Sequence, residues 1–153
     1  MPPRKSLRLT FFEGLLATTD RLTARLGRTP EIAEHLVVGL RGEEAAYFYL
    51  RRLGFTVVAR RWHSHRSAGD LDLIAWEDDV LCFIEVKTRS SRAVAAAEAA
   101  VDEHKRHTLR RIARHYVRLT GQEPTTRFDL LSVYFERDDA PEFVFFRGAF
   151  DWS

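Results

Sequence analysis

Hydrophobic positions along this chain follow a helical spacing in two stretches before they change to alternation. In residues 9–26, apolar side chains recur every three or four positions, and a Gly-Arg-Thr-Pro segment ends the pattern. The same spacing returns from about Ile32 or Gly39 to Leu53, and Gly54 is placed to close that helix. We therefore expect an amphipathic helix near the N-terminus and a second helix after it.

Beyond Gly54 the period becomes two, the spacing of a β-strand with one buried face. Three strands are predicted, and a tight acidic turn joins the last two; they cover residues 55–62, 70–76 and 80–88. A long helix is predicted over residues 95–119, ended by Gly121, and two strands follow at 126–135 and 142–146. This order predicts an α/β fold with a mixed central sheet flanked by helices, to which the N-terminal amphipathic helix is appended.

Length and composition fit one soluble domain. The chain has 153 residues, 45% of them hydrophobic and 30% charged, which is enough for a substantial core. Its one cysteine, Cys82, lies in an apolar run, so we expect no disulfide framework and a reducing, cytoplasmic location. The basic N-terminus has a short apolar stretch broken by Glu13, which is a poor secretory signal and too short to span a membrane. We therefore expect no membrane partner.

Positive charge is concentrated in one segment, although the formal net charge is only +2. Residues 101–120 contain six Lys or Arg, two acids and three histidines. This segment permits a nucleic-acid partner, while a solvated helix face is the plainer explanation of its outer arginines.

Two acids and a lysine stand in strands that are otherwise apolar. Alternation places Glu85 and Lys87 on one face of their strand, and Asp70 and Asp72 on one face of the preceding strand. If residues 78 and 79 form a two-residue hairpin loop, the register pairs Asp72 with Glu85 and Asp70 with Lys87. Directly opposed residues have Cβ atoms about 5 Å apart, so Asp72 and Glu85 are predicted to lie close enough to share one ion.

Like charges that face each other in a sheet destabilise it unless a cation lies between them. Mg²⁺ or Mn²⁺ is the expected cation, because these hard ions take oxygen ligands and keep waters for chemistry. Lys87, one of three lysines beside 21 arginines, adds an ammonium that can orient or deprotonate a water and stabilise charge on a phosphate. Ion pairing on a half-buried sheet is the alternative explanation of the same residues.

Each of the two later helices also aims one charged side chain at the predicted sheet. Glu43 lies on the same stripe as Ala46 and Leu50, although the helix dipole would also favour a glutamate in a first turn. Lys105 lies on the inner stripe of the long helix, so we expect it to reach the site and contact a substrate phosphate.

Four segments together resemble the bacterial YraN-like proteins. They are GLRGEEAAYFYLRRLGFTVVARRW, AGDLDLIAWEDDVLCFIEVKTR, VDEHKRHTLRRIARHYV and RFDLLSVYF, within about residues 36–150, and they carry the motifs G-x-x-G-E-x-x-A, G-[DE]-x-D-L-I-A and F-x-E-V-K-x-R. That family is similar to archaeal Holliday-junction resolvases and has the restriction-endonuclease-like PD-(D/E)XK fold. The resemblance implies an N-terminal extension, residues 1–35, and a restriction-endonuclease-like domain, residues 36–153.

The resemblance also implies a metal-dependent nuclease site. It makes Glu43 the helix carboxylate, Asp72 the central metal ligand, Glu85 the second ligand and Lys87 the active-site lysine. All three acids are predicted metal ligands.

Two positions depart from the family pattern. Asp70 stands where a glutamate is usual, and Arg61 stands where the family commonly has asparagine, which puts any polar contact made there in doubt. For nucleic acid, the expected contacts are Lys105, Arg89 and Arg106.

The leading functional hypothesis is metal-dependent phosphodiester hydrolysis in DNA, including branched or recombination-related DNA, with Mg²⁺ or Mn²⁺ as cofactor. The alternative is a catalytically inactive nucleic-acid-binding protein of the same fold. A third hypothesis is an adaptor whose N-terminal helix docks a partner, and a second copy of the chain in a homodimer is among the partners we consider.

Overall fold

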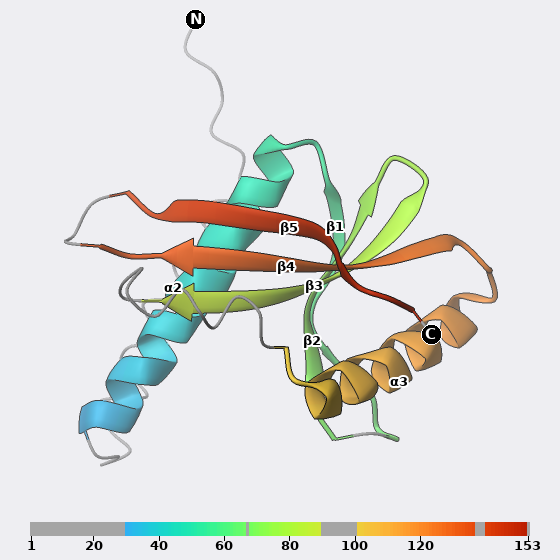
Figure 1. Cartoon of the computed structure of the whole chain (residues 1–153), viewed down its shortest axis with the longest axis horizontal. Helices are drawn as coiled ribbons and strands as arrows, with labels where there is room; N and C mark the ends of the chain where they lie inside the picture. Colours follow the sequence, from blue (N-terminus) through green and yellow to red (C-terminus); the bar gives the residue numbers. More distant parts are fainter. Residues whose placement is uncertain (1–29, 67, 90–100, 137–139, 153) are drawn as a thin grey trace, which may run out of the picture. The chain divides into compact units, whose positions relative to one another are not determined.

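The computed structural model describes residues 30–66, 68–89, 101–136 and 140–152 (Figure 1). The predicted helix over residues 9–26 and nearly all of the predicted extension lie outside these ranges, so both stay predictions. Residues 38–153 belong to one compact unit, which carries every element of the sheet.

The five predicted strands form a single mixed sheet, in which spatial order follows sequence order (Figure 1). Their bounds are β1 Thr56–His63, β2 Asp70–Glu77, β3 Val80–Arg89, β4 Thr125–Tyr134 and β5 Glu142–Phe150. β3 and β4 run parallel, and every other neighbouring pair is antiparallel. A parallel pair needs a long crossover, and the helix α3 (Glu103–Thr120) lies in the connection between β3 and β4.

The two helices pack on opposite faces of the sheet. Successive residues of β3 belong alternately to two hydrophobic clusters: Phe83 packs in the cluster that includes α3, and Ile84 in the cluster that includes α2 (Pro30–Arg52). α3 contributes Leu109, Ile112 and Ala113 to the first cluster, and α2 contributes Ala46 and Leu50 to the second. The predicted α/β class, with a mixed sheet flanked by helices, is thereby confirmed.

The predicted C-terminus of α2 is confirmed. The position of its N-terminus shows whether Glu43 is a first-turn glutamate favoured by the helix dipole. Gly54 has φ of 94°, and the Phe55 N–H donates to the Leu50 carbonyl at 3.0 Å, which closes the helix in a left-handed turn. Because α2 already begins at Pro30, Glu43 lies well beyond its first turn. The helix dipole therefore does not explain Glu43.

α3 begins later than the sequence pattern predicted. Asp102 is its N-cap, with φ of −61° and ψ of 160°, and its Oδ1 accepts the Lys105 N–H at 2.8 Å. A start at residue 95 is therefore wrong, because an Asp in this extended conformation satisfies an N–H that a continuing helix would bond elsewhere. The predicted end is confirmed, since Gly121 adopts φ of 65° and its N–H donates to the Arg118 carbonyl.

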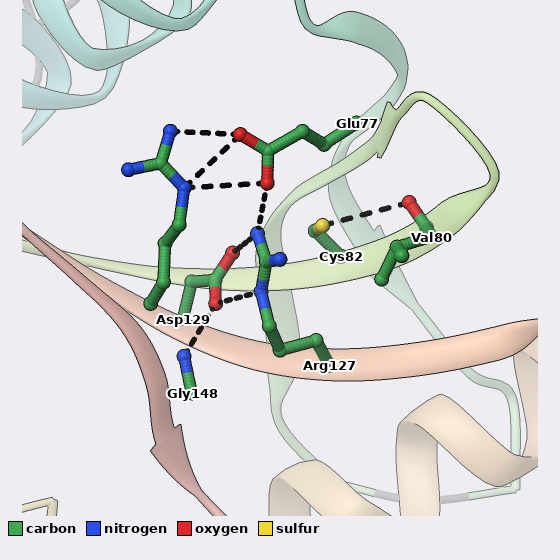
Figure 2. Close-up of polar contacts among 7 residues, drawn as sticks. Glu77, Val80, Cys82, Arg127, Asp129 and Gly148 are labelled. Atoms are coloured by element: carbon green, nitrogen blue, oxygen red, sulfur yellow. Dashed lines mark hydrogen bonds and ion pairs between the residues drawn. The ribbon is translucent and has the colours of Figure 1, made fainter.

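An ion-pair network links the end of β2 with the beginning of β4 and the last part of β5 (Figure 2). Arg127 donates to both oxygens of the fully buried Asp129, at 2.7 and 3.0 Å, and also to Glu77, which pairs with Arg147 as well. The Asp129 carboxylate also accepts the Gly148 N–H at 2.9 Å, at the point where the register of β4 and β5 shifts. The network therefore closes a β-bulge and is structural.

Neither helix of the described chain offers an apolar stretch sufficient to cross a membrane.

Candidate metal and phosphodiester site

β2 and β3 stop pairing where the acidic residues lie. Their antiparallel ladder runs from Glu77–Val80 to Leu73–Ile84, which confirms the predicted two-residue loop. Beyond that pair, β2 continues to pair with β1 as far as its first residue, and β3 continues beside β4 (Figure 1). The predicted pairs Asp72–Glu85 and Asp70–Lys87 are therefore not part of the ladder, because the two strands separate there.

Asp72 lies at this separation and bonds to the backbone of the neighbouring strand. Its Oδ2 accepts the Val86 N–H at 2.7 Å. Burial raises the pKa of the Asp72 carboxyl to about 7, and the negative charge of Glu85 raises it next most strongly, while the bond from Val86 acts the other way. The charges of the two acids therefore interact, although Asp72 and Glu85 are not a pair of the ladder.

Glu85 is the most deeply buried acid of this group, with 5% of its surface exposed. Its Oε1 accepts from the Lys87 Nζ at 2.7 Å, and the Lys105 Nζ lies 3.3 Å from the same oxygen. Its other oxygen, Oε2, is buried and has no hydrogen-bond partner within the part of the chain that the structure describes. An unpartnered carboxylate oxygen is costly to bury, so Oε2 is the atom of this site that most needs a ligand.

The lysines approach Glu85 from two elements. By strand alternation Glu85 and Lys87 share the face of Phe83, which is the face that α3 covers. Lys105 comes from the first turn of α3, so the predicted inward direction of its side chain is confirmed. Cations from a strand and from a helix thus meet at one carboxylate oxygen.

Glu43 approaches the acids from α2. Burial raises the pKa of Glu43, and the charges of Asp70 and Glu85 add to the rise, while the Arg61 guanidinium, 3.5 Å from Oε2, lowers it. Gly42 makes this approach possible, because a Cβ at that position would overlap the Thr88 side chain of β3. Gly42 therefore lets α2 come close to β3 at the residue next to Glu43.

Arg61 adopts a left-handed backbone conformation, with φ of 47°. Asparagine tolerates this region better than other non-glycine residues, which gives a physical reason for the asparagine that the family resemblance led us to expect here. Arg61 nevertheless makes a polar contact, with Glu43. Sequence reasoning missed that contact, since no periodicity marks a residue at a backbone kink.

The chemistry of these donors fits a hard divalent cation held by two carboxylates. The described residues contain no group of three or more His, Cys, Asp or Glu side chains arranged to hold a metal ion. The predicted three-acid set is thus not assembled as a ready-made site, and Glu43 pairs with Arg61 instead. Asp72 and Glu85, with the unpartnered Oε2, match the common Mg²⁺ arrangement of one or two carboxylates completed by water and substrate phosphate.

The predicted nucleic-acid contacts have different surroundings. Lys105 is at the site, and Arg89 is half-buried in β3 two residues beyond Lys87. Arg106 donates to the Val101 carbonyl at 2.8 Å, pairs with Glu103 at 3.7 Å and lies over the Phe150 ring. These contacts hold Arg106 within the chain, so it is the poorest of the three candidates for binding a phosphate.

Ser64, between β1 and β2, contacts His115 of α3, and the sequence pattern predicted a role for neither residue. The buried Ser64 hydroxyl hydrogen-bonds to Nδ1 of His115, and a Cβ at Gly69 would lie 3.2 Å from the Thr108 side chain. Ser64 and Gly69, which precede Asp70, thus lie against the helix that carries Lys105.

Comparison with known proteins gives one family. Residues 42–133 match the uncharacterised protein family UPF0102. A UPF0102 protein of Koribacter versatilis is 50% identical over 121 residues, which cover 79% of this chain and 84% of the relative. UPF0102 proteins of Solibacter usitatus and Porphyromonas gingivalis are 42% and 38% identical, over 89% and 70% of this chain and 97% and 78% of the relatives. The matched range contains Glu43, Asp72, Glu85, Lys87 and Lys105.

Proposed function

We propose that this chain, which belongs to the uncharacterised protein family UPF0102, the YraN-like family, is a metal-dependent nuclease that hydrolyses phosphodiester bonds in DNA. One observation supports this most strongly: Asp72, the buried Glu85 and Lys87 lie where the sheet opens, and Oε2 of Glu85 has no partner among the described residues. The mixed sheet is compatible with the restriction-endonuclease-like fold. Branched DNA is the proposed substrate because of the resemblance to Holliday-junction resolvases.

In this proposal each side chain has one task. Asp72 and Glu85 hold the cation, and the Val86 N–H keeps the Asp72 carboxylate in place. A bound Mg²⁺ or Mn²⁺ would supply an acidified water and would offset negative charge on the phosphate. Lys87, already held against Glu85, orients the water and stabilises the charge that develops on the phosphate oxygens. Glu43 adds negative charge beside Asp72 from the α2 side.

The experiment is cleavage of a four-way DNA junction and of linear duplex in Mn²⁺ by the wild type, Asp72→Ala and Lys87→Ala. Asp79→Ala, in the exposed turn between β2 and β3, is the matched control. We expect cleavage by the wild type and the control, and its loss in both site variants while DNA binding persists. Cleavage that survives Asp72→Ala contradicts the proposal. Binding without cleavage in any divalent ion favours the alternative, a catalytically inactive nucleic-acid-binding protein of the same fold.

A further inference from the structure

The charges around Glu85 are unevenly distributed over its two oxygens. Two ammonium groups share Oε1, from Lys87 at 2.7 Å and from Lys105 at 3.3 Å, whereas the buried Oε2 has no partner among the described residues. One oxygen of the Glu85 carboxylate therefore contacts two cations, and the other oxygen contacts none among the described residues. If Oε2 takes a divalent cation, three positive groups converge on the Glu85 carboxylate, and their mutual repulsion favours the departure of one of them.

Of the two lysines at Glu85, Lys105 is the one whose ammonium can move away. Lys87 lies on the same strand as Glu85, two residues away, and makes the shorter contact. Lys105 belongs to a different element and makes the longer contact, while the two lysine side chains are about equally exposed to solvent, 31% for Lys87 and 35% for Lys105. Its flexible four-carbon stem lets the ammonium move without a change in the backbone, which the bond from the Lys105 N–H to Asp102 holds in place.

The place of Lys105 in α3 gives an independent reason to look for such a role. It is in the first turn of the helix, where the helix dipole disfavours a cation and favours acids such as Glu103. Helix stability therefore does not account for a lysine here. Its ammonium lies instead beside Glu85, at a longer distance than the Lys87 ammonium.

We propose that Lys105 competes with the divalent cation for Glu85 and moves to a phosphate oxygen of the DNA when the cation binds. This inference rests on the proposed function and adds a regulatory step to it. Without the cation, Lys105 neutralises Glu85 and weakens cation binding; with the cation, its released ammonium strengthens DNA binding. Cation and DNA therefore bind cooperatively through Lys105.

The first test is Mn²⁺ affinity, measured by calorimetry without DNA. Lys105→Gln removes the competing charge, so its dissociation constant for Mn²⁺ should be about tenfold lower than that of the wild type. Lys105→Arg keeps the charge and should stay near the wild type. Arg111→Gln, which removes a cation from the exposed outer side of the same helix, should leave Mn²⁺ affinity unchanged. Equal affinities of the wild type and Lys105→Gln overturn the inference.

The second test is DNA affinity, measured by fluorescence anisotropy in EDTA and in Ca²⁺, a divalent ion that also takes oxygen ligands. Lys105→Gln should weaken DNA binding about tenfold in Ca²⁺ and lower the salt slope by about one, with little effect in EDTA. Arg111→Gln should have the same effect in both conditions. An equal loss for Lys105→Gln in Ca²⁺ and EDTA contradicts the proposed movement.

Failure of the proposed function and failure of the inference about Lys105 give different results. If the wild type shows no saturable Mn²⁺ binding that Asp72→Asn abolishes, the proposed function fails, and the inference fails with it. If the wild type binds Mn²⁺ through Asp72 but Lys105→Gln gains nothing, only the inference fails. Thermal unfolding in EDTA confirms that each variant is folded, and Lys105→Arg provides a second, conservative variant at the same position.

Discussion

Asp72→Asn should stabilise the protein against unfolding, although Asp72 is central to the proposed site. In the metal-free protein, burial and the charge of Glu85 raise the pKa of this carboxyl from its ordinary value of 3.8 to about 7. The native state therefore binds a proton more tightly here than the unfolded chain does. As the pH rises from about 4 to 7, ionisation of Asp72 lowers the free energy of unfolding, and the loss is complete above pH 7.

The size of the effect follows from the same two values. Each pKa unit corresponds to about 1.4 kcal/mol, so the difference between 3.8 and about 7 costs the native state about 4 kcal/mol at pH 8. Asparagine carries no charge, and its amide oxygen can still accept the Val86 N–H that Asp72 Oδ2 accepts at 2.7 Å. We expect Asp72→Asn to raise the free energy of unfolding by at most about 4 kcal/mol at pH 8, and by little at pH 4.

Urea denaturation in EDTA at pH 4, 6 and 8 measures this difference, with Asp79→Asn in the exposed hairpin turn as the control. The stabilisation by Asp72→Asn should grow with pH, whereas the control should give a small, constant difference. A stabilisation that is the same at all three pH values, or a destabilisation at pH 8, would refute the reasoning that ionised Asp72 lowers the free energy of unfolding.

Three further substitutions test how the fold positions the site. Gly42→Ala should lower the free energy of unfolding by about 1–3 kcal/mol through overlap with the Thr88 side chain, whereas Gly39→Ala in the same helix, with no atom within 4 Å of the added Cβ, should be neutral or slightly stabilising, as measured by urea denaturation. Arg61→Asn should keep the melting temperature near that of the wild type because asparagine tolerates φ of 47°, while Arg61→Val should lower it; equal effects would contradict the role of this backbone conformation. Asp129→Ala should cost about 3–5 kcal/mol, since it removes the two hydrogen bonds that the partly buried Arg127 makes with Asp129, and a loss under 1 kcal/mol in urea denaturation would show that these bonds are dispensable.

The elements of the sheet could be predicted because each pattern was local. Alternation of apolar and polar residues gave the five strands, and glycines at the helix ends gave two boundaries that the structure confirms at Gly54 and Gly121. The start of α3 could not be predicted in this way, because an alanine-rich segment has high helix propensity while the N-cap Asp102 decides where the helix begins.

Which of the candidate residues lie near one another could be predicted only in part. The hairpin register brought Asp72 toward Glu85, and helical spacing brought Lys105 toward the sheet. The separation of β2 from β3 was not predictable. It depends on the Asp72 side chain, which accepts the Val86 N–H in place of a backbone partner in the ladder. The contact of Arg61 with Glu43 was not predictable either, because it follows from a kink in β1.

Anomalous X-ray diffraction from crystals grown with Mn²⁺ would show whether a divalent cation lies between the carboxylates of β2 and β3. We predict one anomalous peak in contact with Asp72 and with Oε2 of Glu85, and a Lys105 ammonium that no longer contacts Oε1. The absence of a peak at these carboxylates at saturating Mn²⁺, with Lys105 still paired to Glu85, would contradict this prediction.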